Sequence, residues 1–349
     1  MTGDFTSSGT VMIVVAAIVA LFTLRPRLIR APLWRATVTP LASIIGSGFL
    51  VVGPILSNTV GRWAWLAMVA LCVTAYLFGA AIRQNIRLVE PLLERGPPRS
   101  IALLERFSGI ALAFAYFVSV TYYLNLFASF ALRADDLIDP TLTRWTASAV
   151  IIVLGLLGAF RGLGALENVE VGAVGIKLGL IAGLLAALTL AIASALMGHT
   201  FSLPLITHDT GTHEIGVLLG LVILVQGFET SRYLGAHYDG PMRIRTMRLA
   251  QLLSSAIYIA FILLATPFFT NGLPAQGGET AIIDMLQPLG TVVAPLIILA
   301  ALASQLSAAV ADMNGANGLL ETSVARRLPV RAGYLVTAAV AVAITWTAN

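Results

Sequence analysis

The sequence is poor in charge and in cysteine, and each shortage excludes a class of protein. Charged residues make up only 11% of the 349 residues, whereas 58% are hydrophobic and the mean hydropathy is +0.90. Because soluble domains carry about 25% charged residues, this composition indicates a membrane protein. The one cysteine, Cys72, excludes an intrachain disulfide.

Sequence motifs of enzymes and of metal sites are also missing. The chain has no His-Glu-x-x-His, Gly-x-Ser-x-Gly or Walker motif, and its four histidines form no metal-ligand set with cysteine. The net charge of +4 does not indicate a nucleic-acid partner, because the basic residues lie between apolar runs and not in a basic domain. We therefore expect no enzymatic activity, no cofactor and no metal.

Long apolar runs are the dominant feature that remains. A helix needs about 20 apolar residues to cross the ~30 Å hydrocarbon core of a bilayer. The pattern predicts an all-α polytopic membrane protein with ten crossings, at 6–24, 37–57, 63–82, 107–132, 145–160, 167–197, 213–234, 248–270, 286–312 and 332–348.

The basic residues predict the orientation of these crossings. Loops after the odd-numbered spans hold 17 of the 21 lysines and arginines, and the opposite loops hold only Arg62, Arg133 and Arg144. The positive-inside rule therefore places the arginine-rich loops in the cytoplasm and the N-terminus outside, in a multi-pass protein of the cell membrane. The remaining basic residue, Lys177, lies within a span.

Two segments interrupt their spans at corresponding places in two halves of the chain. After an extra N-terminal helix and basic loop (1–35), the polar loop at 198–212 divides the sequence into a first half, 36–197, and a second half, 198–349. Each half opens with a glycine-interrupted apolar segment, at Ile45, Gly46, Ser47 and Gly48 in the first and at Gln226, Gly227, Phe228 and Glu229 in the second. Such pairs indicate the substrate site of an inverted-repeat transporter.

Each interruption has two interpretations. A half-helix that begins near Ser47 would offer free amides and a positive dipole end to an anion such as a carboxylate, whereas the alternative is close packing of helices. Glu229 lies deep in a span, where a carboxylate is costly and normally faces a cavity or a partner. It would hold a substrate ammonium or gate the cavity, and the alternative is a structural pair with Arg232.

These segments resemble the amino acid–polyamine–organocation superfamily. Its first-helix signature is similar to Ile44-Ile45-Gly46-Ser47-Gly48-Phe49, and its sixth helix to Gly227-Phe228-Glu229, although Tyr238-Asp239-Gly240-Pro241 replaces the Glu-x-x-Asn-Pro of many members. The resemblance implies a leucine-transporter-type bundle with a five-plus-five inverted repeat. We expect nine of its core helices here, with the tenth core helix missing. By resemblance to the family's third core helix, Tyr122 would line the substrate cavity.

Lys177 lies about ten residues inside its span, too deep to reach the interface. Desolvation disfavours the charged ammonium, so Lys177 is a candidate proton carrier, and the alternative is a buried pair with Glu170. By resemblance to proton-coupled relatives, its ammonium would replace a sodium ion between carbonyls near Gly46 and the hydroxyls of Ser304 and Ser307. Asp312 is placed near the cytoplasmic end of its span and is given no role.

The resulting prediction is a secondary active transporter of amino acids or related small amines. Its partners would be the substrate, H+ in preference to Na+, and the lipid bilayer, and it would work by alternating access around the two broken helices. The alternative is a non-transporting membrane sensor or assembly subunit built on the same scaffold.

Overall fold

The computed structural model describes residues 2–46, 48–133, 139–199, 211–235, 237–268, 282–289, 292–320 and 329–347, and all regular secondary structure in these residues is helical. The helices of the first half are α1 (Thr2–Thr23), α2 (Pro26–Ile29), α3 (Pro32–Ile44), α4 (Gly48–Val60), η1 (Gly61–Trp63), α5 (Ala64–Gln84), the π-helix η2 (Asn85–Val89), α6 (Glu90–Glu94), α7 (Arg99–Arg133), α8 (Pro140–Arg161) and α9 (Leu163–Met197).

The second half contains shorter and more irregular elements. They are α10 (Thr212–Gly220), the 3-10 helices η3 (Leu221–Val225) and η4 (Phe228–Leu234), α11 (Gly240–Ala265), η5 (Thr266–Phe268), α12 (Ile282–Met285), η7 (Gln287–Leu289), α13 (Val293–Leu319) and α14 (Val330–Thr347). Several starts follow local sequence rules. Asp139 caps α8 by accepting from the Thr141 amide, and Asp239 caps α11 by accepting from the Met242 amide.

The membrane character predicted from composition agrees with the helix lengths. In the described part of the chain, seven helical stretches are long and apolar enough to cross a bilayer: Pro32–Leu93, Arg99–Arg133, Pro140–Arg161, Asn168–Met197, Thr212–Leu234, Gly240–Phe268 and Val293–Leu319. Ser8–Thr23 and Arg331–Thr347 are shorter apolar helices. The 62-residue first stretch includes α3, α4 and α5 and exceeds one crossing. The count of ten crossings stays a prediction.

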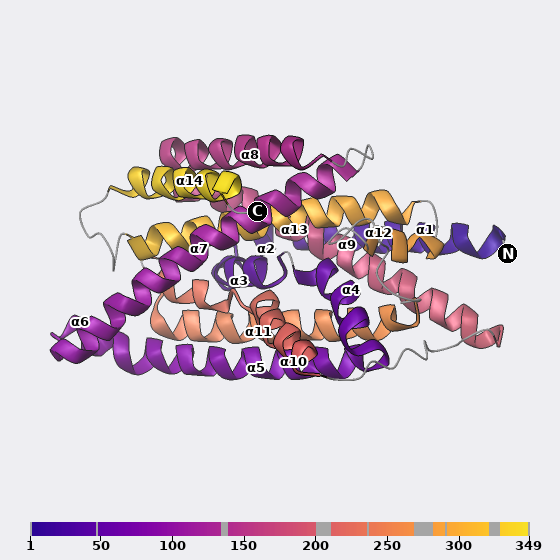
Figure 1. Ribbon diagram of the computed structural model, residues 1–349, viewed down its shortest axis with the longest axis horizontal. Helices are drawn as coiled ribbons and strands as arrows, with labels where there is room; N and C mark the ends of the chain where they lie inside the picture. Colours follow the sequence, from indigo (N-terminus) through magenta and orange to yellow (C-terminus); the bar gives the residue numbers. More distant parts are fainter. Residues whose placement is uncertain are drawn as a thin grey trace.

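The helix α13 is the centre of the bundle, because it packs against α7, α9 and α3 (Figure 1). On one side α14 lies along α8, and on the other α11 packs against both α3 and α5. Of the broken segments, α3 and η4 pack against each other and against both α11 and α13. Nearly all of α13 from Ala300 to Leu319 is buried, which explains its run of small residues.

The N-terminal helix α1 packs along α9 through small residues. A methyl group on Gly179 would lie 2.6 Å from the Ala16 carbonyl oxygen, and one on Gly183 would collide with the carbonyl oxygen of Met12. Glycine therefore allows the two backbones to touch, as small-residue stripes do between membrane helices.

Candidate functional site

The first interrupted helix stops at the residues that the sequence singled out. The helix α3 ends at Ile44, Ile45 and Gly46 are not helical, and α4 begins at Gly48. Ser47, the proposed start of the second half-helix, lies outside the described residues. The interruption frees the last carbonyl groups of α3 from helical hydrogen bonds, because no following turn supplies their donors.

The second interruption is built from 3-10 turns around a left-handed glycine. Between η3 and η4, Gln226 is extended and Gly227 has φ = +110°. A side chain at Gly227 would be strained at this φ, and its Cβ would also collide with Ser43 in the last turn of α3. The Glu229 carboxylate accepts from the Gly227 amide at 2.9 Å and so caps the break locally. Phe228 points into the core and is 2% exposed.

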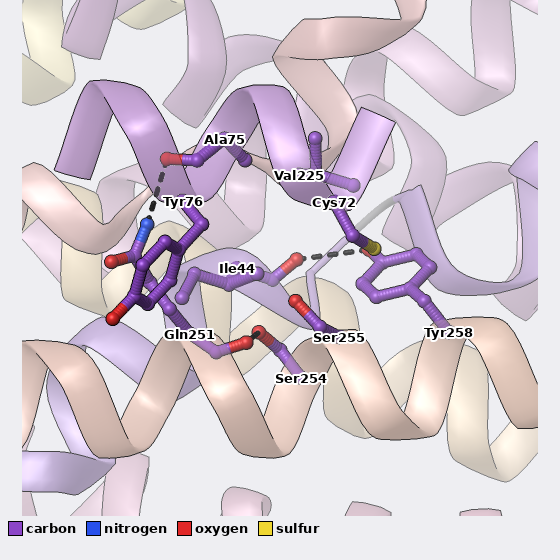
Figure 2. A pocket seen from close by; sticks show the side chains of 9 residues that line it. All are labelled: Ile44, Cys72, Ala75, Tyr76, Val225, Gln251, Ser254, Ser255 and Tyr258. Carbon is purple, nitrogen blue, oxygen red and sulfur yellow. Dashed lines mark hydrogen bonds between the residues drawn. The ribbon is translucent and has the colours of Figure 1, made fainter. Parts of the chain in front are cut away.

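The two interruptions lie against each other. A Cβ on Gly48 would lie 2.7 Å from the Leu224 carbonyl oxygen, and Gly227 touches Ser43, so each break meets the helix end of the other. One side chain bridges them: the Tyr258 hydroxyl of α11 lies 2.9 Å from the carbonyl oxygens of both Ile44 and Leu224. Figure 2 shows the contact with Ile44. Nothing in the sequence separates Tyr258 from an ordinary core tyrosine, and its role is visible only in three dimensions.

A small cavity lies beside Tyr258. It measures about 10 Å³, the lower limit for one water molecule, and polar groups of Gln251, Ser254 and Ser255 line it together with Cys72 (Figure 2). The Gln251 amide donates to the Ala75 carbonyl oxygen at 2.8 Å and accepts from Arg83. This polar seam joins α5 to α11 next to the breaks.

Lys177 reaches the end of the broken α3 from α9. Its ammonium is fully buried and donates to the carbonyl oxygens of Ala42 at 3.0 Å and Ile45 at 2.9 Å, and to the Ser307 hydroxyl of α13 at 2.8 Å. An ammonium has three donors, so these three acceptors satisfy it. One cation thus joins three helices at the first interruption.

Ser304 and Tyr122 have less direct contact with this centre than the sequence suggested. Ser307 donates to the Ser304 carbonyl oxygen, whereas the Ser304 hydroxyl has no hydrogen-bond partner within the described residues. On α7, Tyr123 faces the break, because a Cβ on Gly46 would lie 3.5 Å from its ring. The Tyr122 ring is tilted by 51° against that of Tyr123, with ring centroids 6.2 Å apart.

In the structure the alternative pair of Glu229 with Arg232 does not form, and Asp312, to which no role was assigned, is buried. Arg232 does not serve as the partner of Glu229, because it forms ion pairs with Glu105 at 2.8 Å and with Glu90 at 3.7 Å. Asp312 is not solvated at a helix end: it is 2% exposed and accepts from the hydroxyls of Ser43 and Ser119. The position of a residue along its span indicates how far it lies from the end of the helix. It does not indicate whether neighbouring helices bury its side chain.

A multi-pass helical bundle with two adjoining broken helices, and with ionisable groups at the breaks, has the architecture of a membrane transporter. The chain belongs to the APC superfamily of transporters: the family model with the description "APC superfamily transporter" matches residues 26–349. It is therefore a transporter and not an enzyme.

Two further similarities support this assignment. A protein of Aquifex aeolicus (strain VF5), described as an uncharacterized protein, is 40% identical over 333 residues, which cover 94% of this chain and 81% of that protein. The solved structure of a Na+-coupled sialic acid symporter in its substrate-bound outward-open state has a TM-score of 0.59 and covers 99% of this chain and 81% of its own. At 17% identity, that likeness shows the leucine-transporter-type fold alone.

Proposed function

We propose that this transporter carries amino acids or related small amines by proton-coupled secondary transport. The observation that carries the proposal is the buried Lys177 ammonium, which bonds to the end of the broken α3 and to α13. A coupling site must link ion binding to helix position, and this contact does so through three hydrogen bonds.

Loss of one proton would change this contact in a defined way. A neutral amine keeps two donors and no charge, so at least one of the three acceptors would lose its bond and all would lose the attraction of the cation. The end of α3 would then be held less tightly to α9 and α13. Proton binding at Lys177 would thereby favour one position of α3 over another, as coupling by differential affinity requires.

The substrate would bind where the two breaks meet. Free amides at the start of α4 suit a carboxylate, and Glu229 with the carbonyl ends of α3 and η3 suits an ammonium. We further propose that the segments 36–197 and 198–349 are the two inverted repeats, with the arginine-rich loops in the cytoplasm and the N-terminus outside.

Uptake by purified protein in liposomes tests this function. A mixture of labelled amino acids and amines is offered with an acidic exterior, with an inward sodium gradient at constant pH, or with neither. We expect accumulation only with the acidic exterior. Accumulation that needs sodium at fixed pH would contradict proton coupling, and a failure to take up any amino acid or amine would contradict the substrate class.

The variant Lys177→Met tests the coupling residue. It should abolish accumulation driven by the proton gradient, because the methionine side chain carries no proton. Ser304→Ala is the matched control, since the Ser304 hydroxyl lies one turn from Ser307 but makes no hydrogen bond to Lys177. Equal accumulation by Lys177→Met and the control would remove Lys177 from the mechanism.

A further inference from the structure

A second ionisable group contacts the last turn of the broken α3. Asp312 of α13 is 2% exposed, and its two carboxylate oxygens accept from different helices: Oδ1 accepts from Ser43 of α3 at 2.7 Å, and Oδ2 accepts from Ser119 of α7. Asp312 thus stands where the end of α3, the middle of α7 and the core helix α13 meet.

In the described part of the chain, neutral hydroxyl groups bond to the Asp312 carboxyl group. Across the described residues, no lysine or arginine forms an ion pair with Asp312, and Lys177 donates instead to Ala42, Ile45 and Ser307. Two serine hydroxyls are neutral donors, and a carboxylate has about four acceptor positions. A charge buried without a counter-charge is costly, so a membrane interior retains it where it meets a cation.

A second observation points to a ligand beside Asp312. The hydroxyl of Tyr116 is buried and has no hydrogen-bond partner within the described part of the chain. Tyr116 lies one turn before Ser119 on α7, and its hydroxyl oxygen lies 3.2 Å from the position of a Cβ on Gly315, one turn after Asp312. It also lies near enough to Asp312 and Glu229 to interact with both electrostatically. A buried hydroxyl without a partner normally marks an unfilled bonding position.

From this arrangement we infer that Asp312 determines specificity, selecting solutes that carry a cationic nitrogen at the junction of α3, α7 and α13. The inference rests on the proposed function and names the group that recognises the substrate ammonium. In this structure the hydroxyls of Ser43 and Ser119 occupy the positions that N–H donors of an ammonium would take. Tyr116 and Glu229 lie close to Asp312.

The inference links recognition to the helix breaks. Ser43 is both a donor to Asp312 and the residue that Gly227 touches. An ammonium that replaces the Ser43 hydroxyl at Asp312 would break this contact between the last turn of α3 and α13, while the contacts of Lys177 remain. Substrate and proton would thus act on the same helix end through two separate contacts.

Paired probes that differ only in the nitrogen test the inference. Purified protein is melted with increasing L-alanine or L-lactate, L-serine or L-glycerate, and ethanolamine or ethylene glycol, because a ligand of the folded state raises the melting temperature. The wild type should prefer the amine of at least one pair. Asp312→Asn should reduce the affinity for that amine by about ten- to a hundredfold, the value of a charged hydrogen bond, and should leave the affinity for its hydroxyl analogue unchanged.

Two further variants separate specificity from folding. Asp312→Glu keeps the charge and should retain the preference for the amine even if its affinity falls. Asp284→Asn is the matched control, because Asp284 forms a partly exposed pair with Arg133 on α7, and its ligand affinities should equal those of the wild type.

Each result decides the inference. Loss of the amine preference in Asp312→Asn together with its retention in Asp312→Glu supports it. An unchanged preference in Asp312→Asn, or a wild type that prefers the hydroxyl analogues, overturns it and leaves proton-driven transport standing if uptake is observed. A wild type that neither binds nor transports any of the six probes overturns the inference together with the proposed substrate class.

Discussion

Tyr258→Phe removes one oxygen atom that holds both broken helices. The Tyr258 hydroxyl lies 2.9 Å from the carbonyl oxygens of Ile44 and Leu224, but it has one proton to donate. The two carbonyl groups therefore share one donor, and the substitution removes that donor from both buried acceptors. A buried acceptor that loses its donor costs about 1–3 kcal/mol, and we expect the variant to be destabilised by that amount.

The same change should alter ligand binding, because it loosens the junction at which the substrate is proposed to bind. If the shared hydrogen bond holds the breaks in the binding geometry, its loss should weaken the free energy of ligand binding by up to about 1–3 kcal/mol. This corresponds to a Kd that is roughly 5- to 150-fold higher. Thermal unfolding in detergent measures the first effect, and the ligand-dependent shift of the melting temperature measures the second.

Tyr334→Phe is the matched control for this experiment. Tyr334 is fully buried and donates to Asn314 on α13 at 3.0 Å, away from the carbonyl ends of α3 and η3. Its variant should lose similar stability without a change in ligand affinity. If both variants lower ligand affinity equally, or if Tyr258→Phe changes neither quantity, then Tyr258 does not position the two breaks.

Three further outcomes follow from close contacts and ion pairs. Gly227→Ala places a side chain at a left-handed φ and against Ser43, so it should lower the free energy of unfolding by about 2–6 kcal/mol and reduce uptake. A melting temperature equal to that of the wild type would contradict this backbone geometry. Gly179→Leu should force α1 away from α9 and increase proteolysis of α1, and equal cleavage in the wild type would show that this packing is unimportant. Glu90→Gln removes the carboxylate that pairs with Arg243 at 2.6 Å, and it should cost about 1–2 kcal/mol in thermal unfolding. Because the Glu90 side chain is partly exposed, high salt should reduce that difference, and a salt-independent difference would refute the ionic explanation.

Much of the architecture could be predicted because apolar composition and glycine position are local properties. A run of about 20 apolar residues is a membrane helix in almost any context, since lipid leaves the backbone no other way to satisfy its hydrogen bonds. The glycines at 46, 48 and 227 similarly marked the positions at which a helix would stop. The structure interrupts both helices at these residues.

Residue partners were predicted less well, because they depend on how helices rotate and cross. The pair of Glu229 with Arg232 was the alternative suggested by their spacing of one turn. In the structure η4 is a 3-10 helix, and Arg232 pairs with Glu90 and Glu105 instead. Asp312 was expected to be solvated because it stands near the end of an apolar run. The helix α13 continues to Leu319, and α3 and α7 cover that position.

By itself the sequence determined that the chain is a helical membrane protein, where two of its helices stop, and that one lysine lies deep in a span. These features follow from the hydrophobicity and the backbone freedom of single residues and short runs. Only the tertiary structure decided what those features meet: the bridging hydroxyl of Tyr258, the three acceptors of Lys177 and the burial of Asp312. Each of these contacts joins residues more than 30 positions apart, and their alignment depends on the packing of whole helices, which no local pattern records.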